Sequence, residues 1–125
     1  MNPASSSSPS KSPLILCIDD SDVALRVRKL LLDRAGYNVL TAKSAEEGLD
    51  IFTQYPVDLV VADHFLSGRT GTEIAREMKQ VKPEVLILIF SAVAERPDGL
   101  EFADGFLSKG DPPAVLLDAI ARLLA

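Results

Sequence analysis

The sequence predicts an α/β fold in which helices cover both faces of a parallel β-sheet. Short apolar runs of strand length alternate along the chain with longer segments in which apolar residues recur at helical spacing. The strand-length runs are apolar at nearly every position, which is typical of strands buried on both faces. Polar residues with reactive groups follow the ends of several of these runs, at the edge where open α/β sheets bind ligands.

Five strands and four helices are expected. The strands are predicted near residues 14–18, 38–42, 58–62, 85–90 and 105–108, and the helices near 21–35, 44–54, 70–80 and 112–124. Ser21 can cap the first helix, and Gly36 supplies the left-handed residue that ends it. We expect the inward-facing stripe of this helix to consist of Val23, Val27, Leu30 and Leu31.

Local signals also mark the beginnings of the later helices. Ser44 with Glu47, and Thr70 with Glu73, form capping-box patterns before the second and third helices. Pro112 is suited to the first turn of the last helix. These starts are therefore predicted from side chains that satisfy or avoid the unpaired N–H groups of a first helical turn.

The interval between the fourth and fifth strands breaks the regular alternation. Pro97 and Gly99 disfavour a long helix there. We expect a shortened fourth helix of one or two turns, in addition to the four helices above.

Length and composition indicate one water-soluble domain. Residues 1–13, with six serines and three prolines, are predicted to be a disordered arm, and residues 14–125 the folded domain. No apolar run approaches the ~20 residues that span a bilayer, and the start does not read as a secretory signal, so we expect a cytoplasmic protein.

The charge and the cysteine count exclude further classes. A formal charge of −5 argues against direct binding of nucleic acid, which needs concentrated Lys and Arg. The single cysteine, Cys17, lies within an apolar run and rules out an intramolecular disulfide. We interpret Cys17 as a core residue.

Reactive side chains follow four of the expected strands. Asp19 and Asp20 follow the first strand, Asp63 the third, Ser91 the fourth and Lys109 the fifth. The carboxyl ends of parallel strands meet at one edge of a sheet, so these groups should lie together. A hard divalent cation, best Mg²⁺, would relieve the repulsion between the carboxylates. Asp63 is then the expected nucleophile toward a phosphoryl group.

The five residues, in this order, resemble the markers of a response-regulator receiver domain of two-component signalling, in the CheY-like superfamily. The family's acidic pair falls on Asp19 and Asp20, its phosphoacceptor on Asp63, its hydroxyl on Ser91 and its lysine on Lys109. The resemblance covers the whole predicted domain. It implies a flavodoxin-like, doubly wound sheet of five parallel strands in the order 2-1-3-4-5.

The resemblance also implies a role for each residue at the metal. Asp63 would take a phosphoryl group from a sensor histidine kinase or a histidine phosphotransfer protein. Asp20, Asp63 and the main-chain carbonyl of Phe65 would ligate Mg²⁺, and Asp19 would help through a water molecule. The chain would be a stoichiometric phosphoacceptor and not an enzyme that turns over a substrate.

The remaining family positions imply a switch. Ser91 and Lys109 would bind the phosphate oxygens, and Ser91 and Phe106 would move to change a protein-interaction face. Gly71 stands where the family has a loop glycine. We expect a downstream protein target, a second copy of the chain as a further candidate partner, and no direct contact with nucleic acid or membrane.

Some positions depart from the family pattern. Gly110 replaces the proline that usually follows the lysine, so we expect Lys109 to be aimed differently. Phe65 and Val93 are apolar where receiver side chains flank the path of hydrolytic water, which predicts a long-lived phosphate. His64 is expected to be a loop side chain that tunes access to the site.

Two alternative functions stay open. A receiver-like interaction module that no longer needs phosphate would fit Gly110 and the shortened helix. A haloacid-dehalogenase-like phosphatase is suggested by Asp20-Ser21-Asp22, which imitates its Asp-x-Asp motif. The second match is incomplete, since Ala24 stands where that motif has Thr or Val.

Overall fold

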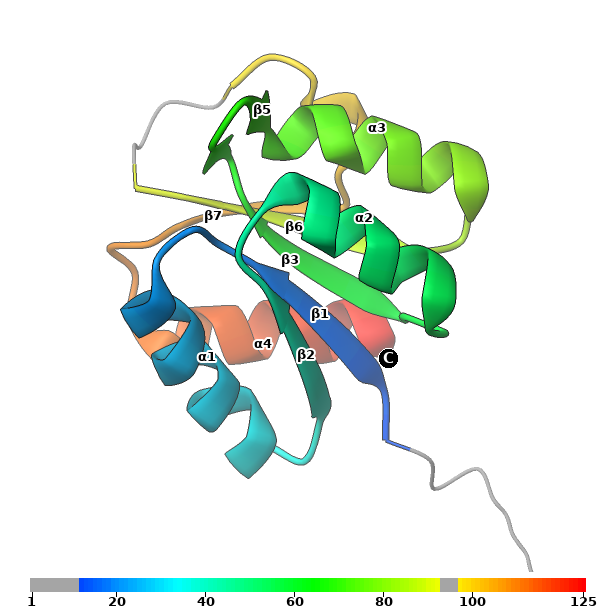
Figure 1. Cartoon of the computed structure of the whole chain (residues 1–125). Coiled ribbons are helices and arrows are strands. Elements are labelled where there is room, and N and C mark those ends of the chain that lie inside the picture. Colours follow the sequence, from blue (N-terminus) through cyan, green and yellow to red (C-terminus); the bar gives the residue numbers. More distant parts are fainter. Residues whose placement is uncertain (1–11, 93–96) are drawn as a thin grey trace, which may run out of the picture.

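Five parallel strands form the central layer of the domain, in the order β2-β1-β3-β6-β7 (Figure 1). The computed structural model describes residues 12–92 and 97–125, so most of the predicted arm lies outside the described residues. The strands in spatial order are β2 Asn38–Ala42, β1 Leu14–Ile18, β3 Leu59–Asp63, β6 Leu86–Ser91 and β7 Gly105–Ser108. Numbered by their sequence order within this sheet, they give the predicted order 2-1-3-4-5, which is confirmed.

Helices cover both faces of the sheet (Figure 1). One face carries α1 (Asp22–Arg34) and α4 (Pro113–Leu124), and the other carries α2 (Ala45–Gln54) and α3 (Gly71–Val81). Parallel strands require such crossover helices, which is why both faces are buried. The five strands and these four helices begin and end within about one residue of their predicted bounds.

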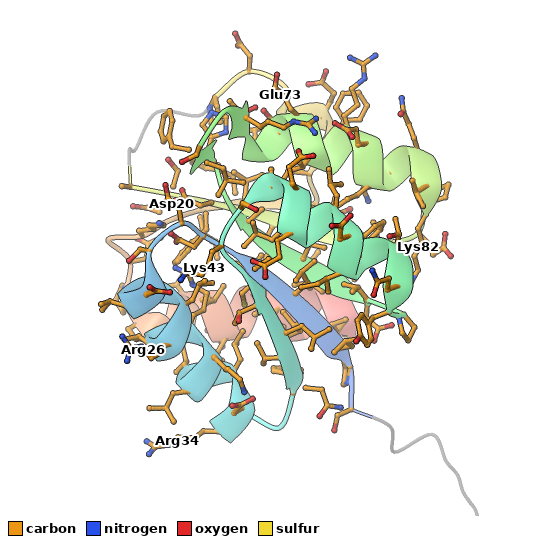
Figure 2. The ribbon with its side chains drawn as sticks, viewed as in Figure 1. Asp20, Arg26, Arg34, Lys43, Glu73 and Lys82 are labelled. Atoms are coloured by element: carbon orange, nitrogen blue, oxygen red, sulfur yellow. The ribbon has the colours of Figure 1, made fainter. Side chains whose placement is uncertain are left out.

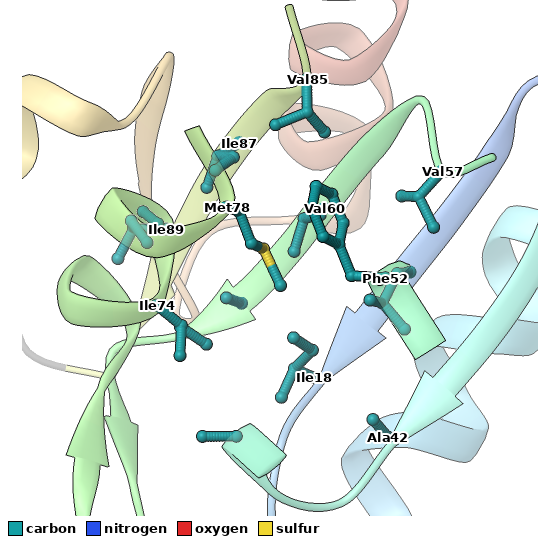
Figure 3. Close-up of a cluster of buried hydrophobic side chains, with 14 of the residues drawn as sticks. Ile18, Ala42, Phe52, Val57, Val60, Ile74, Met78, Val85, Ile87 and Ile89 are labelled. Atoms are coloured by element: carbon teal, nitrogen blue, oxygen red, sulfur yellow. The ribbon is translucent and has the colours of Figure 1, made fainter. Parts of the chain in front are cut away.

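The core lies in two layers because strand side chains alternate between the faces. Figure 3 shows the layer under α2 and α3, where Phe52, Ile74 and Met78 pack against the sheet. Cys17 points to the other layer, under α1 and α4. Burial raises the pKa of its thiol to about 12, so Cys17 is a neutral core residue, as predicted.

Helix α1 packs in a different phase from the predicted one. Three members of the expected stripe are exposed, namely Val23 at 65%, Val27 at 63% and Leu30 at 52%. The buried residues of the helix are Leu25, Arg28 and Leu32, while Leu31 packs partly against the core. The predicted inward-facing stripe was therefore wrong. The residues that face the core are Leu25, Arg28 and Leu32, a second stripe at helical spacing that is harder to recognise because its central residue is an arginine.

Two short features between the main elements were not foreseen in detail. Strands β4 (Phe65–Leu66) and β5 (Arg69–Thr70) form a small antiparallel hairpin between β3 and α3. Gly68 turns it with a φ of 80°, a conformation that favours glycine. Between β6 and β7, the described residues contain only a short 3₁₀ helix, η2 (Leu100–Phe102), in keeping with the predicted shortened helix.

Within residues 12–92 and 97–125, no helix is both long enough and apolar enough to cross a membrane.

Candidate functional site

The three predicted aspartates lie together at the carboxyl end of the sheet. Asp19, Asp20 and Asp63 each place one carboxylate oxygen within 4.8 Å of the others. Adjacent parallel strands cause this, since β1 and β3 pair with Ile18 opposite Ala62, one residue before the site on each strand. Asp19 and Asp63 are buried, whereas Asp20 is exposed at the rim (Figure 2).

This donor set fits Mg²⁺, which prefers carboxylate oxygens and usually takes only one or two of them directly while keeping water. The exposed Asp20 and the nearby Asp63 supply such oxygens at the open edge of the site. The buried Asp19 is engaged by groups of the chain itself.

Lys109 links two of the carboxylates. Its Nζ donates hydrogen bonds to Asp19 Oδ2 at 2.7 Å and to Asp63 Oδ2 at 3.0 Å. Its backbone N–H donates to the carbonyl of Ser91 at 2.7 Å, which ties the end of β7 to the end of β6. With Gly110 at the next position, the ammonium group of Lys109 reaches both acids.

Asp19 is held by three donors. Besides Lys109, its Oδ2 accepts a hydrogen bond from Arg28 Nη2 at 3.3 Å, and its Oδ1 accepts one from the N–H of Ser21 at 3.0 Å. Burial opposes ionisation of Asp19, but the hydrogen bonds from Lys109 and Ser21, with the charges of Lys109 and Arg28, outweigh it and lower its pKa. Asp19 is therefore ionised at neutral pH, with both oxygens already in use.

Arg28 is the site residue that the sequence reasoning missed. Its guanidinium bonds Asp19 and lies over the ring of Phe90, 4.8 Å from the ring centre. The available signal was spacing: Arg28 stands three residues after Leu25 and four before Leu32, on the same helix face.

The loop after Asp63 is built closely around this residue. Asp63 Oδ1 accepts a hydrogen bond from the N–H of Phe65 at 3.3 Å, and the N–H of Gly71 donates to the carbonyl of His64 at 2.7 Å. A Cβ on Gly71 would lie 2.6 Å from the carbonyl oxygen of Asp63. Only glycine fits this approach without a backbone shift, which accounts for the loop glycine noted in the sequence.

His64 lies in the bend between β3 and β4, so it is a loop residue, as expected. It is buried, and its ring meets that of Phe65 edge-on, with 4.7 Å between the ring centres. Among the described residues its Nδ1 has no hydrogen-bond partner. The burial of this loop residue next to the β4–β5 hairpin was not predicted from the sequence.

The remaining predicted positions lie where the strands place them. Ser91 is fully buried at the end of β6. Phe106 is partly buried in β7 and packs toward the α2 and α3 face. Phe65 is 55% exposed in β4, two residues after Asp63, and Val93 lies outside the described residues.

Comparison with known proteins places this arrangement in a family. The family model described as the response regulator receiver domain matches residues 15–121. The chain belongs to this family. The predicted resemblance is confirmed: the chain is a receiver domain of two-component response regulators, and its acidic pocket is consistent with the phosphoacceptor site of that family.

Solved receiver domains share the fold. The chain aligns with a CheY-like receiver domain from Methanospirillum hungatei with a TM-score of 0.83 and 26% identity, covering 90% of this chain and 93% of that one. It aligns with the response regulator TrrA from Thermotoga maritima, solved in complex with Mg²⁺ and BeF, with a TM-score of 0.85 and 27% identity, covering 89% and 98%.

Curated relatives are longer proteins. The chain is 33% identical to the transcriptional regulatory protein GlrR of Escherichia coli over 86 residues, which cover 69% of this chain and 19% of GlrR. It is 34% identical to the alkaline phosphatase synthesis transcriptional regulatory protein PhoP of Bacillus subtilis over 103 residues, covering 79% and 43%. The receiver domain therefore corresponds to less than half the length of these relatives.

Proposed function

We propose that Asp63 is a stoichiometric phosphoacceptor, loaded from the phosphohistidine of a sensor histidine kinase or a histidine phosphotransfer protein. The observation that carries the proposal is the position of Lys109 Nζ, which bonds both Asp63 and Asp19 beside a third carboxylate. The ammonium group of Lys109 can donate a hydrogen bond to the Asp63 carboxylate before transfer and to the phosphoryl oxygens after it. Transfer of a phosphoryl group needs alignment and charge stabilisation above all.

In this proposal Asp20, Asp63 and the main-chain carbonyl of Phe65 hold Mg²⁺, and Asp19 assists through water. When bound, Mg²⁺ neutralises part of the charge on the phosphoryl oxygens. An oxygen of Asp63 attacks phosphorus, the O–P bond forms as the N–P bond of phosphohistidine breaks, and the electron pair of that bond returns to the imidazole, which keeps or takes up a proton. Lys109 then shifts its hydrogen bond from Asp63 to the acyl phosphate.

The switch would run through the ends of β6 and β7. Ser91 is fully buried, and its backbone carbonyl accepts a hydrogen bond from the N–H of Lys109. A phosphorylated side chain carries a charge of about −1.5 to −2 and draws nearby donors toward it. We propose that Ser91 moves to the phosphate and that Phe106 follows, which changes the face around β7 and η2.

The signal would pass to a protein. GlrR and PhoP are transcriptional regulators by name. For this domain the net charge of −5 favours a protein target, or a second copy of the chain, over direct contact with nucleic acid. We place the reaction in the cytoplasm, as the composition predicts.

Acetyl phosphate tests the proposal directly. Incubated with acetyl phosphate and Mg²⁺, the protein is expected to gain one phosphoryl group by intact mass, stable in acid and labile in base. Asp63→Asn should gain none, because an amide is not a nucleophile toward phosphorus.

The same experiment separates the alternatives. A phosphorylation-independent interaction module would gain no mass in either protein. A haloacid-dehalogenase-like phosphatase would instead release phosphate continuously from a phosphate ester. Either result would overturn the assignment of Asp63 as a stoichiometric acceptor.

Phe65 gives a second prediction, on the lifetime of the phosphate. Its exposed ring stands two residues after Asp63 and cannot orient water by hydrogen bonding. Phe65→Asn should shorten the half-life of the acyl phosphate severalfold, measured by loss of mass after removal of the donor. Phe65→Leu is the matched control and should keep the long lifetime. Equal half-lives for the Asn and Leu variants would refute the role of Phe65.

A further inference from the structure

Arg28 is a charged residue on the core-facing side of α1. It is 6% exposed and lies between Leu25 and Leu32, which are both buried against the sheet. Arginine is almost never buried this deeply unless it is paired. The placement therefore calls for a partner, and that partner is an acid of the phosphorylation site.

The contacts of Arg28 are few for a buried guanidinium. Nη2 bonds Asp19 Oδ2, and the guanidinium lies over Phe90. Nη1 is buried and has no hydrogen-bond partner within the described residues. A buried donor without a partner is destabilising. An apolar side chain would suit this core position better, so packing alone does not account for the arginine.

The charges around Asp19 show what Arg28 adds. Asp19 Oδ2 accepts from both Lys109 and Arg28. Among the described residues, Asp19 pairs with two cations, and without Arg28 it would pair with Lys109 alone. A divalent cation entering the site is therefore attracted by less net negative charge than it would be without Arg28. In addition, the Asp19 carboxylate already accepts hydrogen bonds from Arg28 and Lys109.

We propose that Arg28 is a positioning residue that sets the Mg²⁺ affinity of the site through Asp19. By holding Oδ2, Arg28 keeps Asp19 from ligating the metal directly, and its charge weakens metal binding as a whole. The inference rests on the proposed function, in which Mg²⁺ binds beside Asp20 and Asp63. It raises the Mg²⁺ concentration that is needed to load Asp63 above what the three acids alone would require.

The surroundings of Arg28 allow clean variants. Arg28 lines a cavity of about 320 Å³ between α1 and α4, together with Val27, Leu31, Phe90 and Leu116. The side chain of a methionine or a lysine fits at this position, and its methylene groups can pack against the apolar residues that line the cavity. Lys29, the next residue, offers a matched control, since it is exposed and pairs with Asp33 at 2.7 Å on the helix surface.

Isothermal titration with MgCl₂ alone tests the proposal. Arg28→Met should bind Mg²⁺ about tenfold more tightly than the wild type, because a positive charge close to a divalent cation is removed. Arg28→Lys keeps the charge and should stay nearer to the wild type. Lys29→Met changes the net charge equally but touches no site residue, so its dissociation constant should remain within about twofold of the wild type at moderate salt.

A double-mutant cycle then asks whether Arg28 acts through Asp19. In an Asp19→Asn background, the effect of Arg28→Met should shrink clearly, because the occupied carboxylate is gone. An equal effect in both backgrounds would show a merely distant charge. Circular dichroism checks the fold of each variant, and if Arg28→Met does not fold, Arg28→Gln provides the same loss of charge.

The outcomes distinguish this inference from the proposed function. If the wild type binds Mg²⁺ and is phosphorylated at Asp63, while Arg28→Met binds Mg²⁺ like Lys29→Met, only the role of Arg28 is overturned. If the wild type binds no Mg²⁺ at millimolar concentration, both the role of Arg28 and the proposed Mg²⁺-dependent function are contradicted.

Discussion

Helix α1 follows Asp19 and Asp20, and helix α3 comes after Asp63 and the small β4–β5 hairpin, yet the two helices bury different kinds of side chain. The core face of α3 is apolar in its middle, with Ile74, Ala75 and Met78. Helix α1 gives the central position of its core face to Arg28 and leaves Val27 exposed.

The difference shows that the two helices are fixed by different forces. Helix α3 begins with a complete capping box between Thr70 and Glu73, and its apolar face then packs on the sheet. Helix α1 is capped by Ser21, and its phase places a cation against Asp19. Hydrophobic burial accounts for the packing of α3, whereas electrostatic pairing with the site contributes to that of α1.

The largest expected effect tests the apolar side of this comparison. Met78→Ala removes a fully buried side chain beneath α3 and should lower the free energy of unfolding by about 2–5 kcal/mol. Leu30→Ala in α1 removes a side chain that is 52% exposed and should cost less than ~0.5 kcal/mol. Urea unfolding at neutral pH measures both. Similar losses in the two variants would mean that α1 does not pack in the phase described above.

The same contrast explains what the sequence could predict. Helix and strand bounds followed from caps, glycines and apolar runs, which are local signals, and the fold agrees with them closely. The convergence of Asp19, Asp63 and Lys109 followed from their places at strand ends, because parallel strands bring their carboxyl ends to one edge.

The misses have a common cause in tertiary contacts. Helix α1 carries two candidate stripes, and the buried one contains Arg28, whose pairing with Asp19 is a tertiary contact that no local signal predicts. Strands β4 and β5 have two residues each, too few to show a period. The burial of His64 depends on that hairpin, so it could not be read from the residues beside it.

A smaller effect, seen only in acid, tests the electrostatic side of the comparison. Hydrogen bonds and nearby cations hold the pKa of Asp19 below its ordinary value in the folded protein. The unfolded chain therefore takes up the proton first as pH falls below about 4, and stability that is present at neutral pH is lost as pH falls through the folded pKa. Urea midpoints of the wild type and Asp19→Asn should consequently draw closer between pH 6 and pH 3.

Glu73 supplies the matched control on α3. Hydrogen bonds from Thr70 also lower its pKa, the backbone N–H contributing most, but Glu73 is fully exposed and solvent screens the interaction. The difference in urea midpoint between the wild type and Glu73→Gln should therefore decrease less between pH 6 and pH 3 than the difference for Asp19→Asn. The carboxylate of Asp19 faces Arg28, Lys109, Asp20 and Asp63, and these four residues are present in both the wild type and Asp19→Asn. If the difference in urea midpoint between the wild type and Asp19→Asn stays constant with pH, the pairing of the Asp19 carboxylate with Arg28 and Lys109 does not stabilise the fold. The packing of α1 would then rest on Leu25 and Leu32.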